Sequence, residues 1–210
     1  MNKKIVIIGG AGFIGHNLGI HLKKLGAEVT LIDSLAINNI NSVIDNKDNL
    51  PNPDLALNFL YERLRLIKKE NIKLIIQDAR DYHALTKILH NIKPQIVIHL
   101  AAVSHSNRSN KDPYSTFDHS FRTLENALDC SKNKVEQFIY FSSSMVYGNF
   151  NEKNVDEESN CNPLGIYGAL KFSGEKLVIG YNQVFDLPYT IIRPSALYGE
   201  RCISRRVGQI

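Results

Sequence analysis

The sequence predicts an α/β protein built on a doubly wound parallel sheet, and three features of the chain lead to this prediction. Short β-branched runs alternate with helical patterns almost throughout. Two of these runs, residues 4–8 and 95–100, are apolar at nearly every position, as expected for strands covered on both faces. A glycine-rich turn follows the first run and leads directly into a helical pattern. We therefore expect one sheet with helices on both sides.

The predicted elements follow one another in the order of repeated βαβ units. The predicted strands are residues 4–8, 28–32, 72–77, 95–100, 137–142 and 189–193. The predicted helices are residues 13–25, 81–91, 116–131 and 167–185. The alternation is interrupted between residues 34 and 71, where an Asn-rich loop precedes a basic helix over about 54–70. Residues 151–163 are predicted to form an acidic surface loop.

The basic helix allows two interpretations, a binding patch or a solvated outer face, and the second is the simpler. Its charged residues are then predicted to face water: Arg63, Arg65, Lys68 and Lys69. Its apolar residues are predicted to face the core: Leu57, Leu60, Leu64 and Ile67.

The composition limits the classes of partner. The formal charge of +4 comes from 25 basic and 21 acidic residues spread along the chain, which favours no nucleic-acid partner. Cys130, Cys161 and Cys202 are too widely spaced for a disulfide framework or a zinc site, which predicts reduced thiols and no metal. No apolar run approaches the ~18 residues of a membrane span, and Met1 leads into a strand rather than a signal peptide. We expect a cytoplasmic protein with no membrane partner.

The glycine-rich turn, residues 9–15, contains the spacing Gly-x-Gly-x-x-Gly between the first strand and the first helix. Glycines let the turn tighten and let backbone N–H groups come close to a pyrophosphate. The N-terminus of the following helix adds partial positive charge at the same place. This arrangement is typical of the Rossmann fold. It predicts dinucleotide contacts at Gly9, Gly12, Phe13, Ile14 and Gly15.

Asp33 ends the second predicted strand, 18 residues after Gly15. A carboxylate at this position can accept hydrogen bonds from the adenosine ribose hydroxyls. It also repels the 2′-phosphate of NADP, and the residues that follow, Ser34, Leu35 and Ala36, include no base to offset the repulsion. The sequence therefore predicts NAD rather than NADP as cofactor.

Tyr167 and Lys171 are four residues apart at the start of a predicted helix, so they share one face. A phenol with an ordinary pKa of about 10 is a poor base at neutral pH, but a nearby ammonium favours the phenolate. Taken alone, such a pair is more often structural. Here residues 142–144 place three serines at the carboxyl end of the fifth predicted strand, where α/β proteins bind ligands. Their hydroxyls can hydrogen-bond a substrate oxygen.

With these motifs in place, the chain resembles the extended short-chain dehydrogenase/reductase family, in its group of NAD-dependent nucleotide-sugar epimerases and dehydratases. The resemblance extends from Lys4 to about Arg201 and rests on seven motifs in the order typical of the family. They are the glycine turn at 9–15, Asp33, Asp78-Ala79, His99-Leu100-Ala101-Ala102, the SSSMVYG stretch at 142–148, Tyr167 with Lys171, and Arg193-Pro194.

The resemblance implies a role for each matched residue. The implied cofactor contacts are Asp78 and Ala79 at the adenine, Leu100, Ala101 and Ala102 at the phosphates, Lys171 at the nicotinamide ribose, and Pro194 and Ser195 at the nicotinamide. Tyr167 would be the catalytic base, acting with Lys171, and Ser143 the catalytic serine, with Ser144 as the alternate if the strand is shifted. The implied substrate contacts are Ser104, Ser143, Ser144 and Tyr167.

Departures from the family pattern narrow the implied reaction. Dehydratases and decarboxylases of the family typically carry an acidic residue just before the Val-Tyr-Gly motif, whereas Ser144 and Met145 stand there in this chain. Elimination is therefore not expected, which leaves hydride transfer at C4 of a GDP- or UDP-linked sugar by an epimerase or a 4-dehydrogenase. His119 also replaces the Asn usual before the central helix, which puts contacts there in doubt.

The length of the chain is a further departure. Residues 1–200 are predicted to form the NAD-binding Rossmann domain, and residues 201–210 the start of a C-terminal substrate domain that is largely absent. The chain would be a fragment of a longer enzyme or a natural short form. The alternative from another class is a non-catalytic NAD-binding or assembly protein. A homodimer formed by helices 116–131 and 167–185 is also expected from similar enzymes.

Overall fold

The computed structural model describes residues 2–37, 39–104, 106–150 and 154–203. Its sheet has six strands in the order β3-β2-β1-β4-β5-β6. The strands are β1 (Lys4–Ile8), β2 (Glu28–Asp33), β3 (Lys73–Ile76), β4 (Ile96–His99), β5 (Gln137–Phe141) and β6 (Tyr189–Ile192). All six predicted strands are therefore confirmed, with ends that differ by at most one residue.

Strand β1 lies at the centre of the sheet and pairs in parallel with β2 on one side and β4 on the other. Ile5 lies opposite Val29 in the first pair and Ile96 in the second. Further strands are added outward in both directions, so the winding reverses between β1 and β4. Ligands of doubly wound folds bind beyond the carboxyl ends of the strands at this reversal. The predicted doubly wound Rossmann sheet is confirmed.

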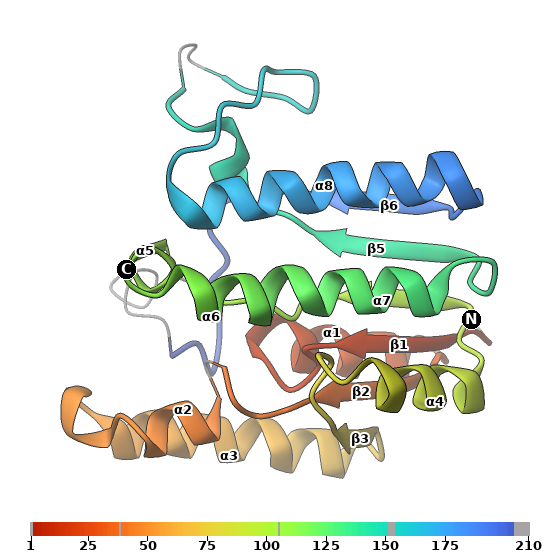
Figure 1. Cartoon of the computed structure of the whole chain (residues 1–210). Helices are drawn as coiled ribbons and strands as arrows, with labels where there is room; N and C mark the ends of the chain where they lie inside the picture. The colour runs from red at the N-terminus through yellow and green to blue at the C-terminus, as the bar shows by residue number, and fades with distance from the viewer. Residues whose placement is uncertain (1, 38, 105, 151–153, 204–210) are drawn as a thin grey trace.

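Helices cover both faces of the sheet (Figure 1). They are α1 (Phe13–Lys24), α2 (Ile40–Ile44), α3 (Pro53–Lys69), α4 (Tyr82–Ile92), α5 (Ser106–Lys111), α6 (Pro113–Phe117), α7 (Thr123–Ser131) and α8 (Gly165–Phe185). Figure 1 shows α4, α7 and α8 on one side of the sheet and α1 and α3 on the other. Within the described ranges, no helix combines the length and the apolar character needed to cross a bilayer.

Residues of β1 point alternately to the two faces, so this strand contributes to both hydrophobic cores. Val6 belongs to the core that includes Leu124 of α7 and Val178 of α8. Ile7 belongs to the opposite core, with Ile67 of α3. Full burial of each such side chain stabilises the fold by about 1.5–3 kcal/mol. The central strand is therefore anchored from both sides, which holds its carboxyl end rigidly beneath the glycine turn.

The helix predicted over residues 116–131 begins earlier and is not uniform. Asp112 caps α6 by accepting a hydrogen bond from the Ser115 N–H at 3.0 Å, and Pro113 occupies the first turn. A π-helical turn, Asp118–Arg122, then joins α6 to α7. The Asp-Pro start signal was present in the sequence, whereas a π-helical turn has no comparable local signature.

The predicted outer face of α3 is wrong for Arg63, which is only 1% exposed. Leu60 and Ile67 pack inward as predicted. Arg63 lies three positions after Leu60 and four before Ile67, so it shares their face of the helix. The Arg63 guanidinium donates to the backbone oxygen of Arg201 from Nε at 3.2 Å and from Nη2 at 2.5 Å. Burial lowers the pKa of Arg63 to about 10. Arg65 remains exposed, as predicted.

After β6 the chain runs along the carboxyl ends of the strands toward α1 and α2 (Figure 1). Arg201 donates to Nε2 of His16 and to Oδ1 of Asn17, each at 3.1 Å, and Ile203 packs against the small core that includes Leu60. Residues 201–203, where a second domain was predicted to begin, thus pack on the Rossmann sheet's own helices. Residues 204–210 of that prediction, and 151–153 of the predicted acidic loop, lie outside the described residues.

Candidate active site

The glycine turn, residues 9–15, packs too closely against its neighbours to carry side chains at three positions. Gly9 has φ +82°, and a Cβ there would lie 2.7 Å from the backbone N of Ala101. A Cβ on Gly10 would lie 2.6 Å from the Leu31 side chain, and one on Gly15 would lie 2.6 Å from the Cα of Gly10. Gly9, Gly10 and Gly15 are therefore required by the packing of the turn itself.

Gly12 is open on its outer side, because a Cβ there would approach only the Gly9 oxygen, at 3.1 Å. This glycine is the N-cap of α1 and has no side chain to bond the backbone N–H groups of the first helical turn. Free N–H groups at a helix N-terminus bind phosphate oxygens. The geometry thus fits a pyrophosphate at Gly12, Phe13 and Ile14, as the sequence predicts.

The Asp33 carboxylate connects the glycine turn to the segment after β2. Its Oδ2 accepts from the Ala11 N–H at 2.9 Å, and its Oδ1 accepts from the Leu35 N–H at 2.8 Å. Burial raises the pKa of Asp33, while these hydrogen bonds and the charge of Arg63 oppose the rise. Each carboxylate oxygen keeps a further lone pair for a ribose hydroxyl. Nε and Nη2 of the nearby Arg63 donate to the Arg201 carbonyl, so these two donors are not available to a 2′-phosphate.

Asp78 follows β3 and is held by Arg80, which donates from Nη2 at 2.7 Å to one carboxylate oxygen and from Nε at 3.1 Å to the other. Arg80 also donates to Asp118 of the π-helical turn at 2.6 Å. Burial works against ionisation of Asp78, but the hydrogen bonds and charge of Arg80 outweigh it and lower its pKa. Ala79 beside it is buried. His119 lies near this pair, and burial is the main reason that its pKa is lowered.

The segment after β4 lies beside the glycine turn. The Leu100 N–H donates to the Ile8 oxygen at 2.8 Å, which continues the pairing of β1 and β4 by one step. Ala101 and Ala102 follow, half-buried, and Ala101 contacts the turn at Gly9. Ser104, a predicted substrate contact, is exposed a few residues further along. The predicted phosphate contacts from β1 and β4 thus lie together at the reversal of winding.

The ends of β5 and β6 also lie together. The Ser142 N–H donates to the Ile192 oxygen at 2.8 Å, and the Ser144 N–H donates to the Pro194 oxygen at 2.9 Å. The serine run is therefore adjacent to Pro194, the residue predicted to contact the nicotinamide. Ser195 is exposed, and its hydroxyl accepts from the Ala196 N–H at 2.6 Å.

Of the two candidate serines, Ser143 is the one whose side chain interacts with the Tyr167 phenol and works against the rise of its pKa. Ser143 also accepts from the Met145 N–H at 3.2 Å, which orients its side chain. The approach of α8 depends on Gly168, because a Cβ there would lie 2.8 Å from the Met145 oxygen. Burial raises the pKa of Tyr167, and the interaction with Ser143 only partly offsets this. The sequence predicted that Lys171 would lower the pKa of Tyr167, and the structure shows no such effect.

Lys171 is buried one helical turn after Tyr167. Its Nζ donates to the Phe141 oxygen at 2.6 Å and lies 5.1 Å from the centroid of the Tyr140 ring. Burial lowers the pKa of Lys171 to about 8, and the charge of Glu175 opposes the decrease. The amine is thus held in place at the end of β5, and Glu175, its electrostatic partner, was not predicted from the sequence.

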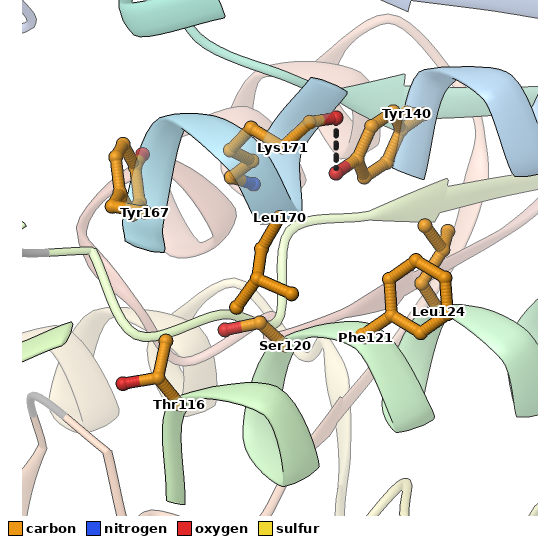
Figure 2. Close-up of a pocket in the computed structure, with 8 residues that line it drawn as sticks. All are labelled: Thr116, Ser120, Phe121, Leu124, Tyr140, Tyr167, Leu170 and Lys171. Atoms are coloured by element: carbon orange, nitrogen blue, oxygen red, sulfur yellow. Dashed lines mark hydrogen bonds between the residues drawn. The ribbon is translucent and has the colours of Figure 1, made fainter. Parts of the chain in front are cut away.

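A small cavity lies between α8 and the helices α6 and α7 (Figure 2). Figure 2 shows Tyr167 and Lys171 on one helix, with Thr116 and Ser120 on the segment opposite. The cavity has a volume of about 10 Å³, which is room for about one water molecule. Ligand pockets are typically about 300–1,000 Å³, so this cavity adjoins the reactive side chains without being a substrate site. The sequence did not predict that Thr116 and Ser120 line this cavity. Their spacing of four residues would have placed both hydroxyls on one helical face.

His99, at the end of β4, is 1% exposed and gives a first testable prediction. Burial, together with the charge of Lys171, lowers the pKa of His99 to about 3, while the Thr123 backbone offsets this slightly. An unfolded histidine has a pKa of about 6.5, so below that pH the unfolded chain binds a proton that the folded chain excludes. We expect the free energy of unfolding to decrease as pH falls from about 6.5 toward 3, with about 2 kcal/mol lost through this group by pH ~5.

Urea unfolding of the wild type and of His99→Leu between pH ~8 and ~4.5 measures this contribution. The wild type should lose more stability than the variant over that range. His16, whose pKa burial lowers to about 4, contributes equally to both proteins and does not affect the difference. Equal slopes for the two proteins would contradict the prediction.

Comparison with known proteins gives the same family as the sequence motifs. The chain is 33% identical over 198 residues to Protein CapI of Staphylococcus aureus, covering 93% of this chain and 54% of the relative. It is 32% identical over 213 residues to a dTDP-D-glucose 4,6-dehydratase of Dictyostelium discoideum, covering 95% of this chain and 45% of the relative. The chain thus spans about half the length of the curated relatives it matches.

Among solved structures, the chain is similar to UDP-glucuronic acid 4-epimerase from Bacillus cereus in complex with UDP-glucuronic acid and NAD. The TM-score is 0.73 at 28% identity, and the match covers 90% of this chain and 55% of that one. The model of the NAD dependent epimerase/dehydratase family matches residues 5–209, nearly the whole chain. The glycine turn, Asp33, and the Ser143–Tyr167 contact beside Lys171 are thus found in a chain that belongs to the NAD dependent epimerase/dehydratase family.

Proposed function

We propose that this chain is the NAD-binding part of a nucleotide-sugar epimerase or 4-dehydrogenase that transfers hydride at C4 of the sugar. The single observation that carries the proposal is the placement of Ser143 beside the Tyr167 phenol, one helical turn from the buried amine of Lys171. This arrangement lies at the same sheet edge as a turn shaped for a pyrophosphate. A proton acceptor and a dinucleotide site at one edge suit oxidation of a sugar hydroxyl.

The proposed role of each residue follows from its position in the site. The α1 N-terminus at Gly12 would hold the pyrophosphate and Asp33 the adenosine ribose. Tyr167 would accept the proton of the C4 hydroxyl, and Ser143 would hold the oxygen from which it leaves. When bound, oxidised NAD supplies the hydride acceptor and a positive charge. Lys171, fixed by the Phe141 oxygen, would keep its remaining donors for the nicotinamide ribose.

The proposed substrate is a nucleotide sugar, UDP- or GDP-linked. The solved relatives described as 4-epimerases in complex with UDP-sugars support the uridine nucleotide. One of the relatives is a dehydratase, so elimination is a competing proposal for the reaction. Ser144 and Met145, however, stand where the family's dehydratases typically carry an acidic residue. Return of hydride to the other face of the ketone gives an epimerase, and release of the ketone gives a 4-dehydrogenase.

Calorimetric titration with NAD and NADP tests the cofactor, and NAD is expected to bind more tightly by at least about tenfold, because Asp33 repels a 2′-phosphate. Tighter binding of NADP contradicts this expectation. Near-ultraviolet absorbance of NADH, recorded with UDP-, GDP- and dTDP-sugars, tests the reaction. The assay includes any longer protein in which the reading frame continues beyond Ile210. Absence of turnover with every sugar in that protein counts against the enzyme.

A second candidate is a non-catalytic NAD-binding or assembly protein, which would use the glycine turn and Asp33 but would need no proton acceptor. Tyr167 and Lys171 are both present, one helical turn apart on α8, which favours the enzyme. The assembly itself is proposed to be a homodimer through the α6–α7 segment and α8. Light scattering coupled to size exclusion measures it, and a monomer at all concentrations contradicts it.

A further inference from the structure

An ion pair between a buried carboxylate and a partly exposed guanidinium joins α8 to the end of β6. Glu175, 2% exposed, accepts from Nε of Arg193 at 2.9 Å and from Nη2 at 2.8 Å, one bond to each carboxylate oxygen. Glu175 lies one helical turn after Lys171, on the same face of α8. Arg193 directly precedes Pro194, the proposed nicotinamide contact. The pair therefore connects the helix of Tyr167 and Lys171 with the strand end that is proposed to face the nicotinamide.

The same guanidinium reaches a third element. Nη1 of Arg193 donates to the Tyr147 hydroxyl at 3.0 Å and to the Glu157 backbone oxygen at 3.1 Å. Its central carbon lies 5.1 Å from the centroid of the Tyr147 ring. Tyr147 ends the short turn Ser144–Tyr147, which Ser143 begins. One arginine thus holds the segment that carries the catalytic serine.

Such a pair costs free energy to assemble, so its presence suggests a function. Removing the Glu175 carboxylate from water costs several kcal/mol, and apolar replacements of such pairs are often equally stable. The bonds of Arg193 account for both oxygens of Glu175 and meet at the point where α8, the serine turn and β6 converge. We propose that Glu175 and Arg193 are positioning residues that fix Tyr167, Lys171 and Ser143 relative to one another and to the nicotinamide end of the site.

The pKa of Lys171 distinguishes a positioning role of Glu175 from a role in fold stability alone, because the charge of Glu175 acts on that pKa. The titratable groups that face Lys171 are Tyr140 on β5, His99 on β4, and Tyr167 and Glu175 on α8. Of these, Glu175 is the one whose charge raises the pKa of Lys171. Glu175→Gln removes that charge and leaves the Arg193 cation without its partner. Both changes disfavour the ammonium form of Lys171.

Titration of the Lys171 side chain by NMR, with ε-¹³C-labelled lysine and assignment by Lys171→Met, measures this directly. The wild type is expected to titrate with a pKa of about 8, and Glu175→Gln about one pH unit lower. Glu175→Asp, which keeps the charge, should restore most of the difference. The matched control is Glu125→Gln, which removes an exposed carboxylate paired with Arg122 at 3.5 Å on α7 and should leave the Lys171 titration unchanged.

If Glu175→Gln does not fold, the double variant Glu175→Leu/Arg193→Met replaces the pair with apolar groups and is expected to fold. It should lower the pKa of Lys171 and also weaken NADH binding, measured by NADH fluorescence, by threefold or more, about 0.7 kcal/mol. A wild-type Lys171 titration and wild-type NADH affinity in the variant would overturn the proposal, whatever the melting temperature. The prediction for NADH binding rests on the proposed function. If the wild type binds no NADH, that function fails, while the Lys171 titration still tests the pair.

Discussion

Tyr167→Phe is expected to reduce hydride transfer to a nucleotide sugar by roughly 10²–10⁴-fold while NAD binding is retained. The phenol is the group beside Ser143, and loss of its hydroxyl leaves no proton acceptor at that position. The ring that remains still fills the half-buried site at the start of α8, so folding and cofactor contacts are preserved. Absorbance of NADH measures the transfer, and calorimetry measures NAD binding.

Tyr181→Phe is the matched control, because it removes a hydroxyl from the same helix. The Tyr181 hydroxyl lies 3.5 Å from Oδ1 of Asp129, on α7, and contacts none of the proposed site residues. Turnover in this variant should equal that of the wild type. Full turnover in Tyr167→Phe would falsify the assignment of the base. If neither substitution alters any function of the protein, the non-catalytic NAD-binding candidate is favoured.

Gly15→Ala is expected to weaken NAD binding by tenfold or more and to lower the free energy of unfolding by about 1–3 kcal/mol. The added Cβ would lie 2.6 Å from both the Gly10 Cα and the Gly9 oxygen, and 2.7 Å from the Gly10 oxygen. All of these are backbone atoms, so relief requires the turn to open and move the first N–H groups of α1 out of line. Calorimetry should detect at least a tenfold loss of affinity, about 1.4 kcal/mol, and urea unfolding the loss of stability.

Gly180→Ala is the matched control for a glycine within a helix. A Cβ at Gly180 of α8 would meet nothing within 4 Å. The substitution should raise the free energy of unfolding by about 0.5–1 kcal/mol, because alanine loses less conformational freedom on folding. NAD binding should not change. If Gly15→Ala behaves like Gly180→Ala, the close packing of the glycine turn is not required for cofactor binding.

The strands and most helix ends followed from local patterns. β1 and β4 were predictable because a strand covered on both faces is apolar along its length. α1 was predictable because its glycine turn and its apolar spacing are adjacent in the chain. The early start of α6 at Pro113 also had a local signal, which the prediction overlooked. The π-helical turn after it had none, since it reflects how the segment fits against its neighbours.

The site was only partly predictable for the same reason. The sequence placed Tyr167 and Lys171 on one face, and the structure agrees. It left Ser143 and Ser144 as alternatives, because which serine meets Tyr167 depends on how β5 ends against α8. It also expected Lys171 to lower the pKa of Tyr167, whereas burial of the phenol dominates. Burial depends on packing between elements, and spacing within one helix cannot reveal it.

By itself, the sequence determined the fold class, the glycine turn and the residues that carry the proposed chemistry, because each is specified by neighbours within a few positions. The tertiary structure alone decided which charges are buried and what they bind. Arg63 reaches a carbonyl 138 residues away, and Arg193 joins Glu175 and Tyr147 across three elements. A buried charge must find a partner wherever the fold brings one close, and that proximity is set by how distant elements pack.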